Sequence, residues 1–309
     1  MIQQEFYQKV KKRLTAGTLL EREPMSKHTT FRIGGPADIF VQPADVDELW
    51  NVIHLAREEK VPFFIVGNGS NLLVSDEGFR GMILHTGGLR NISVEGEVIY
   101  AQAGALLSSV ARQALEHGLT GMEFAAGIPG TLGGAVCMNA GAYGGEMKDI
   151  LMDVEVLTRD GERLVLSVEE LKLSYRHSVI FEKDYAVVAA HIRLSRGYKT
   201  QIRNRMNELA EARKAKQPLE YPSAGSTFKR PEGYFAGKLI QDTGLKGYTV
   251  GGAQVSEKHS GFVINRGNAT AEEVRFLIRQ VQKKVKQQFD VEMEPEVRML
   301  GFTDTEVKK

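Results

Sequence analysis

The chain has 309 residues, of which 42% are hydrophobic and 26% are charged. The length suggests two or three domains. The composition is typical of a globular protein and excludes a disordered or fibrous chain. The formal net charge of +1 excludes a global field that would draw the whole molecule to nucleic acid or to a membrane surface, so recognition of an anion must be local.

Cysteine usage and the lack of long apolar stretches indicate a cytoplasmic protein. Cys137 is the single cysteine, so neither an intrachain disulfide nor a four-cysteine zinc site can form. A chain of this size without disulfides suits a reducing compartment. Residues 1–14 lack the apolar core of a signal peptide, and no stretch approaches the ~18 apolar residues of a membrane helix. We therefore expect no membrane insertion and no binding of nucleic acid.

Helical periodicity is clear in four places along the chain. Apolar residues at 46, 49, 50 and 53 follow the i, i+3, i+4, i+7 rule, and a second stripe runs from Ala105 to a stop at Gly118. Residues 199–216 are polar and helical in pattern. The fourth helix starts at Thr270, where Thr270 and Glu273 have the spacing of a capping box.

Short β-rich runs lie between these helices. Helices and strands do not alternate strictly, which favours α+β domains over a barrel. A domain boundary is expected near the short glycine-containing segment that follows Ser195. The predicted strands are Phe63–Val66, Met82–His85, Val98–Ala101, Val154–Thr158, Arg163–Ser167, Val187–Leu194 and Gly261–Asn265.

The first glycine-rich segment follows the apolar strand at 63–66 and reads Gly67-Asn68-Gly69-Ser70-Asn71. A turn of this composition exposes backbone N–H groups that can cradle a pyrophosphate. It is neither a Walker A loop nor a G-x-G-x-x-G fingerprint. Taken alone, a plain turn explains the segment equally well, because these residues dominate turns in general.

The second glycine-rich segment is longer and more specific. Residues 119–146 contain eight glycines, in two turn-forming runs on either side of a short apolar stretch. Each glycine in an ordered element costs ~0.5–1 kcal/mol relative to alanine. So many in one place indicate a large flat or phosphorylated ligand against bare backbone.

Three polar sites could carry chemistry, and each has an ordinary structural interpretation. Without further context, Arg176 of the Tyr175-Arg176 pair is better interpreted as a surface arginine. Ser226 has no histidine at the spacing of a nucleophile elbow, which argues against a hydrolase. Glu296 lies on the polar face of an alternating run at 291–300, as on a half-buried strand with one solvated face.

Basic residues concentrate in one part of the chain. Residues 196–230 carry nine Lys or Arg against three Glu, which suits a diphosphate because arginine binds two oxygens at once. The alternative is that these basic residues simply form a solvent-exposed face of a helix. The histidines show no H-E-x-x-H pattern and no clustering with Cys137, so we expect no metal.

Taken together, these motifs resemble the UDP-N-acetylenolpyruvoylglucosamine reductase family of peptidoglycan precursor synthesis. The resemblance runs from about Thr29 to Arg298. VGNGSNLLV at 66–74 and GIPGTLGGAVCMNAGAYGGE at 127–146 are similar to the family's FAD-binding signatures. Tyr-Arg at 175–176, AGSTFK at 224–229 and EPEVR at 294–298 are similar to its three catalytic signatures. Several motifs in the right order are far more specific than any one of them.

The resemblance implies an α+β protein. Residues 1–80 and 81–198 would form the two subdomains of an FAD-binding fold of the vanillyl-alcohol oxidase type, and residues 199–309 a C-terminal α+β substrate-binding domain. FAD would be bound non-covalently, with NADPH as co-substrate, a UDP-sugar as substrate and a monomer as the working unit. The implied FAD contacts are Gly67, Asn68, Gly69, Ser70, Asn71, Gly127, Ile128, Pro129, Gly130, Gly133, Gly134, Ala142 and Tyr143.

The resemblance also assigns roles to polar residues. Catalysis falls to Arg176, Ser226 and Glu296, and substrate binding to Tyr175, Arg213 and Lys216, the last two at the diphosphate. Arg230 stands where one branch of the family has asparagine. That branch also has a tyrosine-bearing lid loop after the Tyr-Arg motif. Here only a short segment, residues 177–186, follows it, which fits the shorter branch.

Two other functions are consistent with the same residues. A related FAD-dependent oxidase of a small hydroxylated substrate would share the fold, because a fold alone does not fix function. Many such oxidases hold FAD covalently through a histidine, so release of the flavin on acid precipitation would distinguish them. A non-catalytic nucleotide-binding protein would be colourless, or yellow without being bleached by NADPH.

Overall fold

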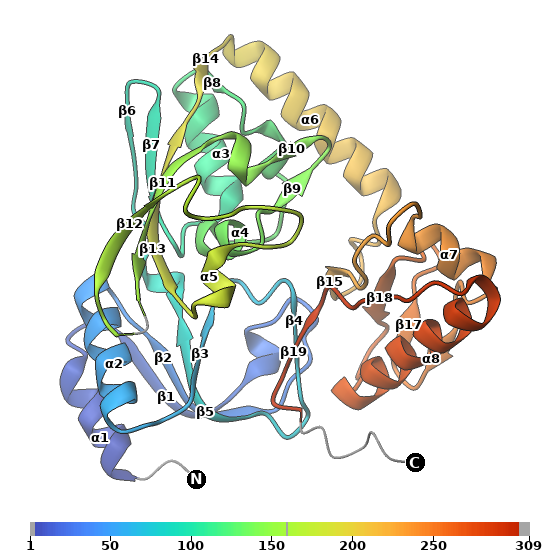
Figure 1. Ribbon diagram of the computed structural model, residues 1–309, viewed down its shortest axis with the longest axis horizontal. Helices are drawn as coiled ribbons and strands as arrows, with labels where there is room; N and C mark the ends of the chain where they lie inside the picture. Colours follow the sequence, from blue (N-terminus) through green and yellow to red (C-terminus); the bar gives the residue numbers. More distant parts are fainter. Residues whose placement is uncertain (1–3, 159, 303–309) are drawn as a thin grey trace. The chain divides into compact units, whose positions relative to one another are not determined.

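The computed structural model describes residues 4–158 and 160–302, which form two compact units (Figure 1). The first unit contains Met1–Glu21, Ile39–Asn68 and Gly81–Arg213, and the second contains Arg22–Asp38, Gly69–Arg80 and Lys214–Lys309. The chain thus enters the second unit twice before residue 81. In the described residues, no helix is both long and apolar enough to cross a membrane. The predicted domain boundaries after 80 and 198 stay predictions.

The N-terminal part of the chain forms a four-stranded sheet with two helices, most of whose residues belong to the first unit. The strand order is β1-β2-β5-β3, and β3 pairs in parallel with β5. Residues of both helices share one hydrophobic core with β2 and β5. The elements are α1 (Gln4–Arg13), β1 (Thr18–Pro24), β2 (Pro36–Gln42), α2 (Val46–Glu58), β3 (Phe63–Val66) and β5 (Phe79–His85).

A buried carboxylate joins α2 to the loop after α1. Glu48, in the first turn of α2, is 3% exposed. Its carboxylate accepts hydrogen bonds from the backbone N–H groups of Thr15, Ala16 and Ala44 at 2.6, 2.8 and 2.8 Å. Burial alone would raise the pKa of Glu48, but these hydrogen bonds outweigh burial and lower the pKa to about 2. The carboxylate therefore acts as a fixed internal anion.

The rest of the first unit is built on a five-stranded antiparallel sheet. Its order is β12-β11-β13-β7-β6, and apolar residues of the sheet share a second core with α3 and α4. Gly118, with φ +66°, follows the end of α3. The elements are β6 (Ile92–Glu95), β7 (Val98–Gln102), α3 (Leu107–Glu116), α4 (Leu132–Cys137), β11 (Leu151–Leu157), β12 (Arg163–Ser167) and β13 (Ala186–Arg193).

Several short elements lie along the chain between the longer ones. Strand β8 pairs with β14, and β9 pairs with β10. The helix α6 is the long polar helix that leads out of this part of the chain. The short elements and α6 are β8 (Leu119–Thr120), β9 (Gly141–Ala142), β10 (Gly145–Glu146), α5 (Val179–Glu182), β14 (Ser195–Arg196), α6 (Lys199–Lys216) and the 3₁₀ turns η1 (Met25–Lys27), η2 (Thr86–Gly88), η3 (Glu123–Ala125) and η4 (Met147–Asp149).

The second unit is an antiparallel sheet in the order β15-β18-β17-β16, with α8 packed against it (Figure 1). The third hydrophobic core of the protein lies in this unit and includes residues of the sheet and of the helices α7 and α8. Apart from this sheet, β4 pairs in parallel with β19. The elements are β4 (Leu72–Val74), β15 (Ser223–Ser226), α7 (Ala236–Asp242), β16 (Thr249–Val250), β17 (Ala253–Val255), β18 (Phe262–Asn265), α8 (Ala271–Phe289) and β19 (Arg298–Leu300).

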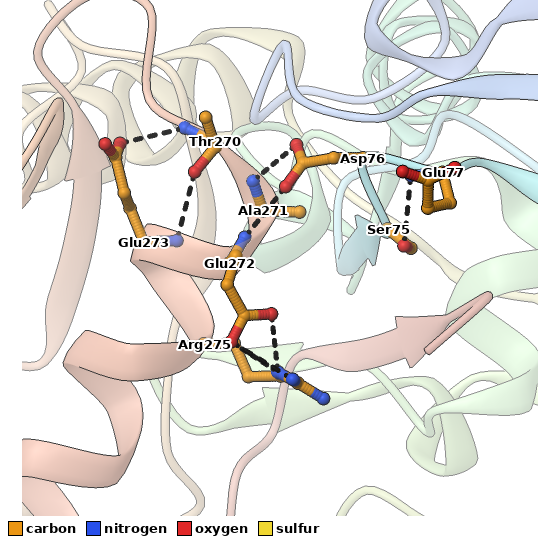
Figure 2. Close-up of polar contacts among 8 residues, drawn as sticks. All are labelled: Ser75, Asp76, Glu77, Thr270, Ala271, Glu272, Glu273 and Arg275. Carbon is orange, nitrogen blue, oxygen red and sulfur yellow. Dashed lines mark hydrogen bonds and ion pairs between the residues drawn. The ribbon is translucent and has the colours of Figure 1, made fainter. Parts of the chain in front are cut away.

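The N-terminus of α8 is capped from two directions (Figure 2). Thr270 and Glu273 form the predicted capping box, with both hydrogen bonds present. Asp76, from the turn after β4, accepts hydrogen bonds from the N–H groups of Ala271 and Glu272 at 2.8 and 3.0 Å. These N–H groups have no partner within the helix, so Asp76 fixes the segment 69–80 to the helix.

The predicted elements are mostly present. All four helices occur, and each predicted strand overlaps an observed one. The alternating run at 291–300 is the exception, because strand pairing there is limited to 298–300 and an isolated bridge at Pro295. Pro295 has no N–H to donate to a ladder, so the predicted strand is wrong over 291–297. The alternation of burial nevertheless persists, with Met293 and Val297 buried.

Candidate active site

The first glycine-rich segment divides after Asn68. Gly67 and Asn68 belong to the first unit, where the Asn68 amide donates a hydrogen bond to the carbonyl of Pro129 at 2.9 Å. A methyl group at Gly67 would lie 2.2 Å from the hydroxyl oxygen of Thr131. The structure therefore brings this turn and the second glycine-rich segment together, as the prediction of one ligand site requires.

Gly69, Ser70 and Asn71 belong to the second unit. Gly69 has φ +59°, and a methyl group there would lie 2.0 Å from the carbonyl oxygen of His28, so packing within the protein explains this glycine without a ligand. Asn71 donates a hydrogen bond from its amide to the carbonyl of Glu296 at 3.1 Å. These residues were predicted to contact FAD, and that prediction is not tested by their protein contacts.

The second glycine-rich segment contains an unpartnered hydroxyl. Thr131 is 4% exposed, and its hydroxyl has no hydrogen-bond partner among the described residues. A buried hydroxyl without a partner costs about 1–3 kcal/mol, so this one is suited to a polar ligand group. Thr131 stands between the predicted contacts Gly130 and Gly133, and we did not select it from the sequence although it lies inside the signature.

Two glycines of this segment are not explained by the protein itself. A methyl group at Gly134 would lie 3.7 Å from the Thr131 hydroxyl, and one at Gly127 would lie 3.4 Å from Cδ of Arg213, which are ordinary contacts. Neither residue has a positive φ. By contrast, a methyl group at Gly133 would lie 3.0 Å from Cβ of Ala103. Bare backbone at Gly127 and Gly134 therefore leaves room for a ligand close to the main chain.

The second turn-forming run is a tight hairpin. Ala142 pairs with Gly145 across the loop, and the two loop residues, Tyr143 and Gly144, have φ values of +53° and +92°. Positive φ at both positions is the requirement of a type I′ hairpin turn. Tyr143 stands at the tip and is 44% exposed, so its ring is available to a ligand.

Arg176 lies in a tight turn of the first unit. Ser174 and His177 exchange two backbone hydrogen bonds of 3.2 Å around it, and Arg176 has φ +57°, a conformation that is uncommon for a residue with a side chain. The guanidinium carbon lies 5.2 Å from the ring centroid of Tyr175, within the range of a cation–π contact. Strained backbone of this kind concentrates at functional sites.

A buried asparagine links this turn to the second glycine-rich segment. Asn139 is 1% exposed, and its amide donates to the Glu146 carboxylate at 2.7 Å and to the Ser174 carbonyl at 3.3 Å. Its side-chain oxygen accepts from the N–H of Lys148 at 2.9 Å. Asn139 thus holds the hairpin and the Arg176 turn in one arrangement. It was missed from the sequence because its partner at 174 is distant in the chain.

The predicted diphosphate contacts lie near the C-terminal end of α6. Arg213 approaches Gly127, and burial lowers its pKa although the nearby Tyr143 raises it. An arginine stays charged at neutral pH even so, so a half-buried cation stands beside the second glycine-rich segment. Lys216, the last residue of α6, is exposed.

The second unit brings Ser226 and Glu296 together. Ser226 ends β15 and pairs with Phe262 of β18. The next residue, Thr227, accepts a hydrogen bond from the N–H of Glu296 at 2.8 Å. The contact continues with Lys229, whose N–H donates to the carbonyl of Glu294 at 2.9 Å and whose side chain forms an ion pair with that residue. Ser226 and Glu296 therefore sit on neighbouring, mutually bonded segments.

Known proteins match the chain over nearly its whole length. A family model described as an FAD binding domain matches residues 37–167, and one described as the C-terminal domain of UDP-N-acetylenolpyruvoylglucosamine reductase matches residues 217–300. The reductase of that name from Caldanaerobacter subterraneus subsp. tengcongensis is 58% identical over 95% of this chain and 97% of its own. The reductase from Agathobacter rectalis is 54% identical over 96% and 99%.

A solved structure agrees with these matches. The crystal structure of UDP-N-acetylenolpyruvylglucosamine reductase from Thermus caldophilus is 36% identical, with a TM-score of 0.79 over 92% of this chain and 99% of that one. The predicted α+β fold, an FAD-binding fold followed by a C-terminal domain, is thereby confirmed. The unpartnered Thr131 hydroxyl and the bare backbone at Gly127 and Gly134 fit a bound FAD. The chain belongs to the UDP-N-acetylenolpyruvoylglucosamine reductase family.

Proposed function

We propose that this protein reduces the enolpyruvyl ether of UDP-N-acetylglucosamine enolpyruvate to the lactyl ether of UDP-N-acetylmuramate. NADPH would be the electron donor, FAD the non-covalent cofactor and peptidoglycan precursor synthesis the pathway. The full-length similarity carries the proposal, because the relatives match 95% or more of the chain and so include both the FAD-binding domain and the C-terminal domain. We further propose that the protein works as a cytoplasmic monomer.

The first unit would hold the cofactor through main chain and a few side chains. The proposed contacts are the turn at Gly67 and Asn68, the Thr131 hydroxyl, the bare backbone at 127–134 and the hairpin tip at Tyr143. When bound, FAD supplies hydride transfer between NADPH and the enolpyruvyl group, which no side chain of the protein can perform. The remaining chemistry is left to charged and hydroxyl groups of the chain.

Arg176 is proposed to stabilise the charge that develops during reduction. As a hydride arrives at the terminal vinyl carbon, negative charge builds on the α-carbon and its carboxylate. A fixed cation stabilises that charge, and removal of one such preorganised group commonly costs ~10²–10³ in rate. The turn supports this role, because its two backbone hydrogen bonds fix the main chain at Arg176 and the Tyr175 ring lies within cation–π distance of the guanidinium.

Ser226 and Glu296 are proposed to complete the reaction by supplying a proton and a hydrogen bond. The α-carbon needs a proton, and the Ser226 hydroxyl can donate one because the carbanion-like carbon is a strong base. Glu296 would act in its protonated form by donating a hydrogen bond to the substrate carboxylate, since an anion there would repel the developing charge. Their adjoining segments, joined by the bond from Glu296 N–H to the Thr227 carbonyl, support a joint role.

The direct test of the function is to purify the protein and follow NADPH consumption. We expect yellow protein that releases its flavin on acid precipitation and oxidises NADPH rapidly once the enolpyruvyl sugar nucleotide is added. Flavin that stays on the precipitated protein, together with NADPH oxidation that the sugar nucleotide does not accelerate, would support the oxidase instead. Protein without flavin would contradict both enzymes, and bound flavin that NADPH does not bleach would contradict the reductase.

The proposed proton donor has its own test in stopped-flow kinetics. In Ser226→Ala, flavin reduction by NADPH should keep its wild-type rate, while reoxidation by the enolpyruvyl substrate should collapse. Glu296→Gln should stay nearly as active as the wild type, since an amide can still donate a hydrogen bond. Wild-type reoxidation in Ser226→Ala, or activity kept by Glu296→Asp and lost by Glu296→Gln, would overturn the corresponding role.

A further inference from the structure

Asn71 closes the first glycine-rich segment and holds the main chain beside Glu296. Its amide donates to the carbonyl of Glu296 at 3.1 Å, and its own carbonyl accepts from the N–H of Arg298 at 3.0 Å. These two bonds extend the parallel pairing of β4 with β19, in which Leu72 is opposite Arg298. The Asn71 side chain therefore points at the peptide group of Glu296.

The main chain around Glu296 depends on a small number of such bonds. Residues 291–297 lack regular strand pairing, and Pro295 has no N–H to contribute. On one side of Glu296, its N–H donates to the carbonyl of Thr227 at 2.8 Å. On the other side, its carbonyl accepts from Asn71, and the Val297 N–H of the same peptide group donates to the Thr227 carbonyl at a longer 3.5 Å. The Asn71 amide and the Thr227 carbonyl together fix both peptide groups that flank the Glu296 side chain.

Asn71 is itself placed on a firmly anchored segment. The strand β4 that follows it is buried throughout. The turn after β4 is tied to the N-terminus of α8 by Asp76 (Figure 2). A side chain on such a support can position another residue accurately, whereas one on a loose loop cannot.

We propose that Asn71 is a positioning residue for Glu296, and that the first glycine-rich segment therefore serves catalysis as well as the cofactor. The inference rests on the role of Glu296 in the proposed function. It differs from the expectation drawn from the sequence, in which Asn71 contacts FAD. The chain offers a matched partner for comparison in the same motif, because the amide of Asn68 bonds Pro129 in the FAD-binding domain.

The test compares three amide side chains in the full-length holoenzyme. Asn71→Ala removes the hydrogen bond, and Asn71→Asp replaces the donor with an acceptor of the same shape. Gln282→Ala is the structural control, because the Gln282 amide donates to the Met293 carbonyl at 2.8 Å, on the same extended segment three residues from Glu296. Asn68→Ala is the control for cofactor binding. Melting temperature, FAD affinity and the two half-reactions are measured for each.

We expect Asn71→Ala to retain FAD, to be reduced by NADPH at the wild-type rate and to be reoxidised by the enolpyruvyl substrate about tenfold more slowly. Asn71→Asp should be slower still, because its carboxylate repels the Glu296 carbonyl. Gln282→Ala should lower the melting temperature as much as Asn71→Ala does, but its reoxidation should keep the wild-type rate. Asn68→Ala should weaken FAD binding.

Three outcomes would overturn the inference. Loss of FAD or slow reduction in Asn71→Ala would make Asn71 a cofactor contact. Equally slow reoxidation in Gln282→Ala would reduce the effect to general loosening of the segment. Unchanged reoxidation in both Asn71 variants would remove the positioning role.

The double variant separates this inference from the proposed function. If Asn71 acts through Glu296, Asn71→Ala should add no further slowing to Glu296→Ala, since residues that act as a unit are not additive. Full additivity would contradict positioning through Glu296. If Glu296→Ala is itself reoxidised at the wild-type rate, the role given to Glu296 fails. If Glu296→Ala is slow and Asn71→Ala is not, the positioning role alone fails.

Discussion

The two glycine-rich segments look alike in sequence, but individual glycines in them have different causes. In the first, Gly69 is required by the protein, because its φ is +59° and a methyl group would lie 2.0 Å from the His28 carbonyl oxygen. In the second, Gly134 has an ordinary φ and an open neighbourhood. A glycine that packing does not require is a better indicator of a ligand than one that packing requires. Counting glycines cannot separate the two.

Substitution by alanine at these two positions should give the largest difference in stability. We expect Gly69→Ala to lower the free energy of unfolding by about 3 kcal/mol or more, from left-handed strain and the clash with a rigid carbonyl. Gly134→Ala should leave the stability of the apoprotein within about 1 kcal/mol of wild type and weaken FAD binding. Urea unfolding of both apoproteins and FAD titration measure this. Similar destabilisation by both would contradict the distinction.

A substitution in the first unit that is distant in sequence from both glycine-rich segments should lower stability without changing FAD affinity. It therefore tests whether the loss of FAD affinity expected for Gly134→Ala is specific. Glu48→Gln should lower the free energy of unfolding by about 2–3 kcal/mol at pH 7, because the charged acceptor of several backbone N–H groups is lost. Where the variant is folded, its FAD affinity should equal that of wild type. Glu58→Gln, at an exposed position of the same helix, is the matched control and should be nearly neutral.

The pH dependence of this difference has a definite sign. The pKa of Glu48 is lowered to about 2 from an ordinary value of 4.5, so its stabilising effect is complete above pH 4.5 and is lost as the pH falls toward 2. The stability gap between wild type and Glu48→Gln should therefore close over that range. A gap that stays constant from pH 7 to pH 3 would show that the ionised carboxylate is not the cause.

Elements and caps with local causes were predictable from the sequence. The capping box of Thr270 and Glu273 was visible from spacing alone, and both of its hydrogen bonds are present. The strand predicted at Arg163–Ser167 has the observed bounds. In each case the residues that decide the structure lie within a few positions of one another, so a local pattern contains the whole physical cause.

Contacts that join distant parts of the chain were not predictable in this way. Asn71 and Glu296 are 225 positions apart, and no periodicity links them. The Thr131 hydroxyl stands out because a partner is lacking among the described residues, which only a folded structure can reveal. The roles of Arg176, Ser226 and Glu296 came from motif resemblance, and periodicity alone favoured a solvated strand face for Glu296.

The smallest effect we expect is that of Thr131→Val, which should raise the stability of the apoprotein and lower its affinity for FAD. Thr131→Val removes a buried hydroxyl that has no partner among the described residues, so the apoprotein should become up to about 1 kcal/mol more stable. If that hydroxyl bonds FAD, cofactor affinity should fall about tenfold, or ~1.4 kcal/mol. Urea unfolding without FAD and fluorescence titration with FAD give the two values.

Thr158→Val is the matched control for this experiment. The Thr158 hydroxyl is buried in the same unit but accepts hydrogen bonds from the N–H groups of Asp160 and Glu162 at 3.2 and 3.1 Å. Its removal should destabilise the apoprotein by about 1 kcal/mol and leave FAD affinity unchanged. If Thr131→Val behaves like this control, losing stability and keeping its affinity for FAD, then the Thr131 hydroxyl serves the fold, and the bare backbone at Gly127 and Gly134 must bind the cofactor without it.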